Sequence, residues 1–128
     1  MRRYAAQYVF LAGGKIYKQY YIELDAAECI KGVYPFENEI GETLFFNGIL
    51  FPVRKSLPWS VQEMVAHLNE LKNHHPADSV FELLEKADFV AVDVAAPVAL
   101  CCLEGIDLSA SRFVPCNDRT AIHIRRLL

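Results

Sequence analysis

The sequence has no long apolar run and no excess of basic charge. None of its apolar stretches approaches the roughly 20 residues that a membrane-spanning helix requires, so we expect no membrane partner. The 128-residue chain has a formal net charge of −3 and a pI of about 5.8. A domain that binds nucleic acid is usually basic, so this charge argues against nucleic acid as a partner.

The sequence also lacks a Cys-x-x-Cys pair, although it has four cysteines. Two of them, Cys101 and Cys102, are adjacent, and on a strand they would point to opposite faces. We therefore expect reduced, buried thiols in a cytoplasmic protein, with a disulfide framework or a zinc site as the alternative. The other two cysteines are Cys29 and Cys116.

Strand patterns dominate the first part of the chain. The N-terminus begins like a signal peptide, but Gln7 and two tyrosines interrupt its apolar part, so we predict a strand. β-branched and aromatic residues predict strands at 3–12, 15–24 and 29–35, with a turn at Gly13-Gly14. Within the second of these strands, one face is predicted to carry Ile16, Tyr20, Ile22 and Leu24.

The stretch "FFNGILFP" contains an Asn-Gly pair between apolar runs. This pair is the strongest short-range signal for a β-hairpin, because a type I′ turn needs positive φ at both central residues. We therefore predict a tight turn at Asn47-Gly48. Strands at this short spacing favour an antiparallel sheet or sandwich.

The middle of the chain changes to a helical period. Ser60 and Glu63 form a capping box, and the apolar residues that follow predict a helix that ends near Asn73. A second, shorter helix is predicted after Asp78 or Ser79, with Glu82 completing its capping box and the end near Ala87.

Strand character then returns at 98–103, with two further short candidates at 112–115 and 121–127. The order of elements predicts an α+β fold, an antiparallel β-sandwich built from N- and C-terminal strands with a two-helix insert. We expect the end strands to join the first sheet. The length and the 53% apolar content suit one domain, 1–128, made of N-terminal strands (1–54), a helical segment (58–88) and C-terminal strands (89–128).

Both ends of the chain resemble a known family. The opening, "RRYAAQYVFLAGGKIYKQYYIELDAAECIKGVYPF…ETLFFNGILFP", is similar to the start of metal-dependent hydrolases of the amidohydrolase superfamily. The segments "LNELKNHHPADSVFELLEKA" and "VALCCLEGIDL" and the closing "RRLL" are similar to their C-terminal region. The resemblance covers most of the chain and implies a small β-sandwich, which in that family stands beside a catalytic (β/α)8 barrel.

The catalytic part of the family pattern is missing. The family continues after the hairpin with a Gly and an His-x-His pair that binds metal, but here "VRKSLPWS" follows Pro52. A barrel of this kind needs about 250 residues, for which the chain has no room. The resemblance thus implies a sandwich without its barrel, with no catalytic residue carried over and no cofactor.

Two chemical alternatives remain open from the residues themselves. A rebuilt metal site for a small hydrolase would use His67, His74 and His75, although the His-Glu-x-x-His pattern is absent. A small-molecule or anion-binding module would use four arginines, which would cluster if the terminal strands were neighbours. These are Arg2, Arg3, Arg125 and Arg126.

The favoured hypothesis is a non-catalytic module that contacts protein. A sandwich that lost its barrel has an apolar flank, and a second copy of the chain would cover it. We expect a homodimer or a contact with another protein, with tryptophan as a frequent interface anchor. The expected interface residues are Trp59, Met64, Phe45, Phe46 and Phe51.

Overall fold

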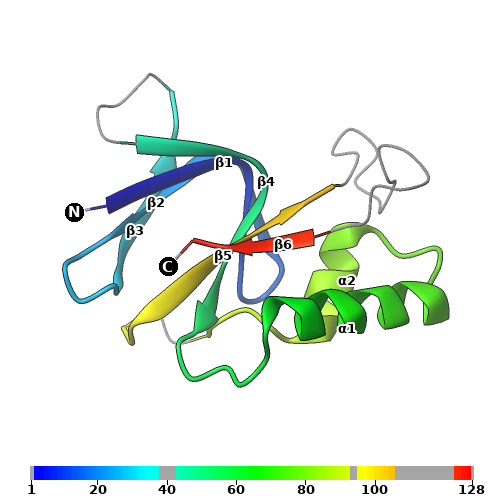
Figure 1. Ribbon diagram of the computed structural model, residues 1–128. Coiled ribbons are helices and arrows are strands. Elements are labelled where there is room, and N and C mark those ends of the chain that lie inside the picture. The colour runs from blue at the N-terminus through cyan, green and yellow to red at the C-terminus, as the bar shows by residue number, and fades with distance from the viewer. Residues whose placement is uncertain (1, 38–42, 93–94, 106–122, 128) are drawn as a thin grey trace.

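A computed structural model describes residues 2–37, 43–92, 95–105 and 123–127 (Figure 1). It contains six strands and two helices within these residues. In chain order they are β1 (Arg2–Leu11), β2 (Lys15–Leu24), β3 (Ile30–Pro35), β4 (Thr43–Arg54), α1 (Val61–His74), α2 (Val80–Ala87), β5 (Val98–Glu104) and β6 (His123–Arg126).

All of the described strands belong to one sheet, with the order β3-β2-β1-β4-β5-β6. The fold is α+β, as predicted, and β5 and β6 do join the N-terminal strands. The sheet is mixed, because β1 and β4 run parallel while the other neighbours are antiparallel. The predicted antiparallel sandwich is therefore not what these strands form. The candidate strand 112–115 lies outside the described residues.

The predicted hairpin at Asn47-Gly48 is wrong. β4 continues through both residues, and neither has positive φ. Along β1 and β4, Ala6 pairs with Phe46 and Tyr8 pairs with Ile49, so β4 carries one additional residue here. This is the two-against-one pattern of a β-bulge. Asn-Gly thus bends one long strand instead of reversing the chain.

The sheet curls on itself. The backbone N–H of Val98 donates to Glu28 O at 3.0 Å, which joins the start of β5 to the turn between β2 and β3. Lys55, just after β4, forms an ion pair with Glu28 at the same place. The curled side encloses one hydrophobic cluster, which includes Tyr4, Ala6, Val9, Ile22, Leu24, Leu50, Val98 and Leu100.

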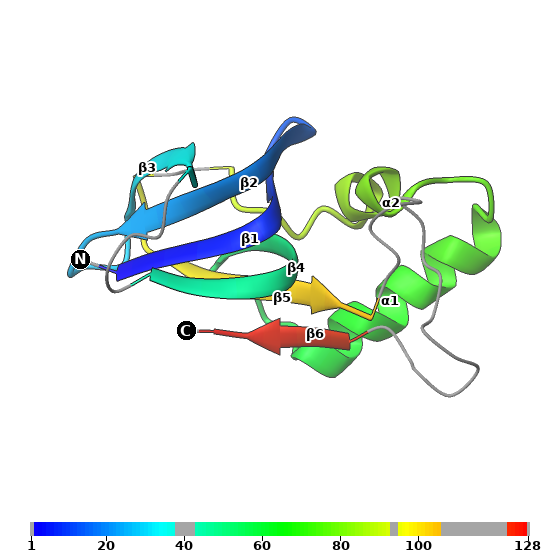
Figure 2. The same ribbon diagram turned by 90° about the horizontal axis from the view of Figure 1, so that it is seen from above.

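The two helices cover part of the other side of the sheet, beside β5, β6 and the end of β4 (Figures 1 and 2). A second cluster fills this contact, and Phe81 of α2 packs on Tyr8 and Phe10 of β1 with ring centroids 5.3 and 6.1 Å apart. Its buried members include Phe51, Val53, Met64, Leu68, Leu83, Leu84 and Phe89.

Both helices begin where their capping boxes predict. The Ser60 and Ser79 side chains accept from the backbone N–H groups of Glu63 and Glu82, respectively. α1 ends one residue after Asn73, and α2 ends at Ala87 as predicted. Among the described residues, no helix is long and apolar enough to cross a membrane.

Candidate functional site

A row of three aromatic side chains and one alanine crosses four strands on the side of the sheet opposite the enclosed cluster. Tyr34 of β3 pairs with Tyr21 of β2, Tyr21 with Ala5 of β1, and Ala5 with Phe45 of β4. Residues paired in register lie on the same face, so these four form one line, here called the outer aromatic row. The Tyr21 and Tyr34 ring centroids are 5.5 Å apart.

A polar row runs beside it, two residues along each strand. Its pairs join Gly32 to Glu23, Glu23 to Arg3 and Arg3 to Thr43. Arg3 Nε donates to Glu23 Oε2 at 2.9 Å, so the centre of this row carries one cation next to one anion. The Thr43 hydroxyl is buried at the end of the row without a hydrogen-bond partner among the described residues.

The helices leave this half of the sheet uncovered, because they lie at the opposite end (Figure 2). Tyr34 and Phe45 are 43% and 47% exposed, which is high for large side chains. Phe36, which follows β3, adds a ring 5.9 Å from that of Phe45. The outer aromatic row and the polar row together form an exposed face, here called the outer face.

The predicted interface residues fall into different environments. Phe45 is on the outer face, whereas Phe46 is partly buried against the enclosed cluster. Phe51 and Met64 are 0% and 2% exposed in the chain's own core, so their side chains offer no surface to a partner. Trp59 is half-buried and packs on Phe89 with the ring centroids 5.3 Å apart.

The three histidines do not come together as a metal site. His67 contacts the rings of Trp59 and Phe89, at 4.9 and 5.8 Å between centroids. His74 is the last residue of α1 and His75 is its C-cap, both exposed. In the described part of the chain, no group of three or more His, Cys, Asp or Glu side chains is placed to hold a metal ion.

The four arginines do not gather on one edge. Two strands, β4 and β5, separate β1 from β6, so the terminal strands are not neighbours. Arg3 is paired with Glu23, and Arg125 donates to both carboxylate oxygens of Glu104, at 3.0 and 3.2 Å. The cluster of Arg2, Arg3, Arg125 and Arg126 was expected only if the terminal strands were neighbours, and in the described sheet they are not.

The described cysteines are free thiols. Cys101 and Cys102 are buried on opposite faces of β5, as predicted, and burial raises their pKa values to about 11 and about 12. Such thiols are protonated at neutral pH and are poor nucleophiles. Cys29 is half-buried, and Cys116 lies outside the described residues.

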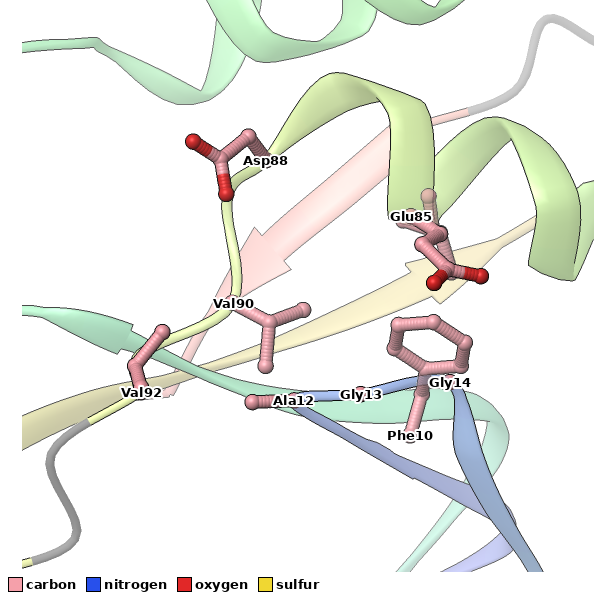
Figure 3. A pocket seen from close by; sticks show the side chains of 9 residues that line it. Phe10, Ala12, Gly13, Gly14, Glu85, Asp88, Val90 and Val92 are labelled. Atoms are coloured by element: carbon pink, nitrogen blue, oxygen red, sulfur yellow. The ribbon is translucent and has the colours of Figure 1, made fainter.

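A cavity of about 180 Å³ lies elsewhere, between the β1–β2 turn, the end of α2 and the segment that follows it (Figure 3). Its wall is apolar where Phe10, Leu84 and Val90 meet. Two carboxylates, from Glu85 and Asp88, also line it, and Figure 3 shows Glu85 pointing from α2 toward Phe10 and the turn. The remaining lining residues are Ala12, Gly13, Gly14 and Val92.

Neither the outer face nor the cavity is evident from the sequence. The alternation in the second strand places Tyr20 with Ile22 and Leu24 and so turns Tyr21 to the other face, but the rows of the outer face depend on the strand pairing. The useful signal is the alternation of Glu23 and Tyr21 with the buried Ile22, which marks an aromatic residue on the polar face. No protein-family model matches this chain, and neither a curated protein nor a solved structure matches it.

Proposed function

We propose that this protein is a non-catalytic interaction module that associates with a second copy of itself through the outer face. The observation that carries the proposal is the outer aromatic row, which leaves Tyr34 and Phe45 exposed on a sheet face without a covering layer. Exposed aromatic side chains grouped on one surface are typical of protein contacts.

The charges of the polar row favour a second copy as the partner. In a two-fold symmetric contact, if residue i of one copy contacts residue j of the other, then residue j of the first copy also contacts residue i of the second. Arg3 of one copy can then lie beside Glu23 of the other, and Glu23 beside Arg3, so the adjacent cation and anion make the face complementary to itself. A strongly cationic partner would be repelled by Arg3, and a strongly anionic partner would be repelled by Glu23.

The area of the outer face determines how tightly two copies are expected to associate. Strands lie about 4.8 Å apart and rise about 3.3 Å per residue, so four strands of about five residues present roughly 300 Å². A stable interface buries about 800 Å² per partner. We therefore expect a weak dimer that dissociates in the micromolar range or above.

Sedimentation velocity from about 10 μM to about 1 mM tests this association, because weak dimers dissociate over that range. The wild-type protein is expected to shift toward twice the mass of 14.5 kDa as the concentration rises. Phe45→Ser should abolish the shift. Leu44→Ser is the matched control, since Leu44 is 58% exposed on the neighbouring position and the opposite face.

Charge reversal gives a sharper test of the symmetry. Arg3→Glu alone and Glu23→Arg alone each place like charges across the two-fold axis, so each variant should be monomeric. Mixed together, the two variants place opposite charges at both contacts and should form a heterodimer. A monomeric wild type at about 1 mM, or a mixture that stays monomeric while the wild type dimerises, would contradict the proposed contact.

The family relationship is a separate part of the proposal. The resemblance to the amidohydrolase sandwich makes this sheet a candidate remnant of such a domain without its barrel, and the union of the first and last strands in one sheet supports it. The hydrolase alternative finds no support, because His67, His74 and His75 are not grouped. The anion-binding alternative is weakened by the separation of the arginines.

A further inference from the structure

We propose that the cavity beside α2 binds an alkylammonium group, supplied by a lysine side chain of a peptide or by a free aliphatic amine. This site is distinct from the outer face, since none of its lining residues belongs to either row. The inference rests on the shape of the cavity and on the charges around it, and it does not depend on self-association.

The apolar wall suits a chain of methylene groups. Phe10 and Leu84 are 2% and 0% exposed, so they lie beneath the surface of the space, and half-buried Val90 and exposed Val92 supply the open apolar lining. A volume of about 180 Å³ is many times the roughly 10–15 Å³ that one water requires. A four-carbon stem therefore has room beside groups that would otherwise contact water.

The charged part of the lining is negative, and its two carboxylates, from Glu85 and Asp88, are exposed. Glu85 and Asp88 have no side-chain hydrogen bond or ion pair with any described residue. They lie at the C-terminal end of α2, where the helix dipole is negative and cations are favoured. Lys86 lies in the last turn, but its ammonium group pairs with Asp78 instead. The two carboxylates thus have no ion-pair partner among the described residues, and a cation bound between them would also lie near the C-terminal end of α2.

The backbone places these two residues beside the turn. Asp88 is in the left-handed conformation, with φ 58°, and its N–H donates to Glu85 O at 3.2 Å. On the other side, a Cβ at Gly14 would lie 3.1 Å from Glu85 Oε2, so glycine is what lets the carboxylate approach the turn. The space beside Gly13 is open, with nothing within 4 Å of a Cβ there. A ligand can enter from that side.

The experiment is a titration of the ¹⁵N-labelled chain, observed through its amide resonances. The probes are Nα-acetyl-lysine methylamide, pentylamine and the neutral Nα-acetyl-norleucine methylamide, each to about 10 mM, which detects millimolar affinity. We expect the lysine derivative or the amine to shift the amides of Gly13, Gly14 and Asp88, and the norleucine derivative to shift none. The tighter of the two cationic probes identifies the source of the group.

Matched variants remove each carboxylate charge without changing the size of the side chain. Glu85→Gln and Asp88→Asn keep the size of each side chain, and Asn tolerates the left-handed conformation. Each should weaken the cationic probes at least about tenfold, a loss of about 1.4 kcal/mol. Glu70→Gln, an exposed glutamate of α1 that does not line the cavity, should bind as the wild type does.

Three results would overturn the inference. These are no shift with either cationic probe, equal shifts with the norleucine derivative, and wild-type affinity in Glu85→Gln and Asp88→Asn. A variant that fails to fold would be recognised by collapsed amide dispersion, and the comparison of the lysine and norleucine probes on the wild-type chain would still decide the question.

Discussion

The substitution Gly48→Ala tests whether β4 is one continuous strand. A Cβ added to Gly48 would lie well under 3.0 Å from the carbonyl oxygen of Leu103 and 2.8 Å from the Cys102 sulfur. Real Cβ atoms essentially never come within 3.0 Å of another atom, so β5 would have to move. A carbonyl oxygen of a central strand cannot rotate away as a flexible side chain does.

The expected loss of stability is about 2 kcal/mol. Overpacking costs about 1–3 kcal/mol, and a backbone obstacle places Gly48→Ala toward the upper end. The lower entropy of alanine in the unfolded chain offsets about 0.4–1 kcal/mol of that. Urea unfolding followed by circular dichroism should show a midpoint lower by about 1 M, since m is about 1–3 kcal/mol per M for small proteins.

Asn47→Ala separates the two interpretations of the Asn-Gly pair. Asn47 is exposed and has no positive φ, so its replacement should change stability by no more than about 0.5 kcal/mol. A type I′ hairpin would instead need positive φ at this position, and alanine would cost about 1–2 kcal/mol. A type I′ hairpin would make both substitutions costly, since both residues would need positive φ, so a costly Asn47→Ala would refute the continuous strand.

A Cys102→Ala background provides the control for the source of the clash. It removes the sulfur but leaves the Leu103 carbonyl in place, so the penalty of Gly48→Ala should persist there. A penalty that disappears in this background would assign the contact to the sulfur instead of the backbone.

Thiol and acid titrations test two other features of the packing. Ellman's reagent should modify half-buried Cys29 in the native protein, but Cys101 and Cys102 only after unfolding, because burial raises their pKa values; fast native modification of either would contradict their burial. The Glu28 pKa is lowered chiefly by the hydrogen bond from Lys55, so its stabilising effect is present above the ordinary value of 4.5 and is lost as the pH falls through the lowered value. Lys55→Met should therefore lose less stability on acidification than the wild type in thermal melts, and equal losses would exclude this contact as the cause.

Local signals in the sequence predicted the local structure well. The helix starts at Ser60 and Ser79 depend on side chains three residues away, and both capping boxes are present. The turn at Gly13-Gly14 depends on two residues with positive φ, and both have it. In these cases the deciding contacts lie within a few residues of one another.

Long-range pairing decided the predictions that failed. The Asn-Gly pair has a strong local preference for a hairpin, but the conformation of Gly48 is set by β5, which lies far along the chain. The antiparallel sandwich failed for the same reason, since the parallel pairing of β1 with β4 leaves no mark on either strand alone.

One face assignment within β2 failed for a more local reason. Strict alternation predicts Ile16 on the same face as Tyr20, yet Ile16 is 45% exposed and Tyr17 packs on the enclosed cluster instead. Gln19, with φ 57°, interrupts the alternation between them. The face of Tyr17 therefore follows from one backbone angle that composition does not reveal.

The length of β4 has a consequence for the order of folding. Its first part pairs with β1 and its last part with β5, so one strand connects the N-terminal meander to the helices and the final strands. The meander is made of contacts between residues close in sequence, whereas the β4–β5 ladder must close a loop that contains both helices. Closing such a loop costs entropy before its contacts form, so β1–β3 should acquire structure early. Pairing of β5 with the last part of β4 is then expected to be the late, slow step, and it brings the helices onto the sheet.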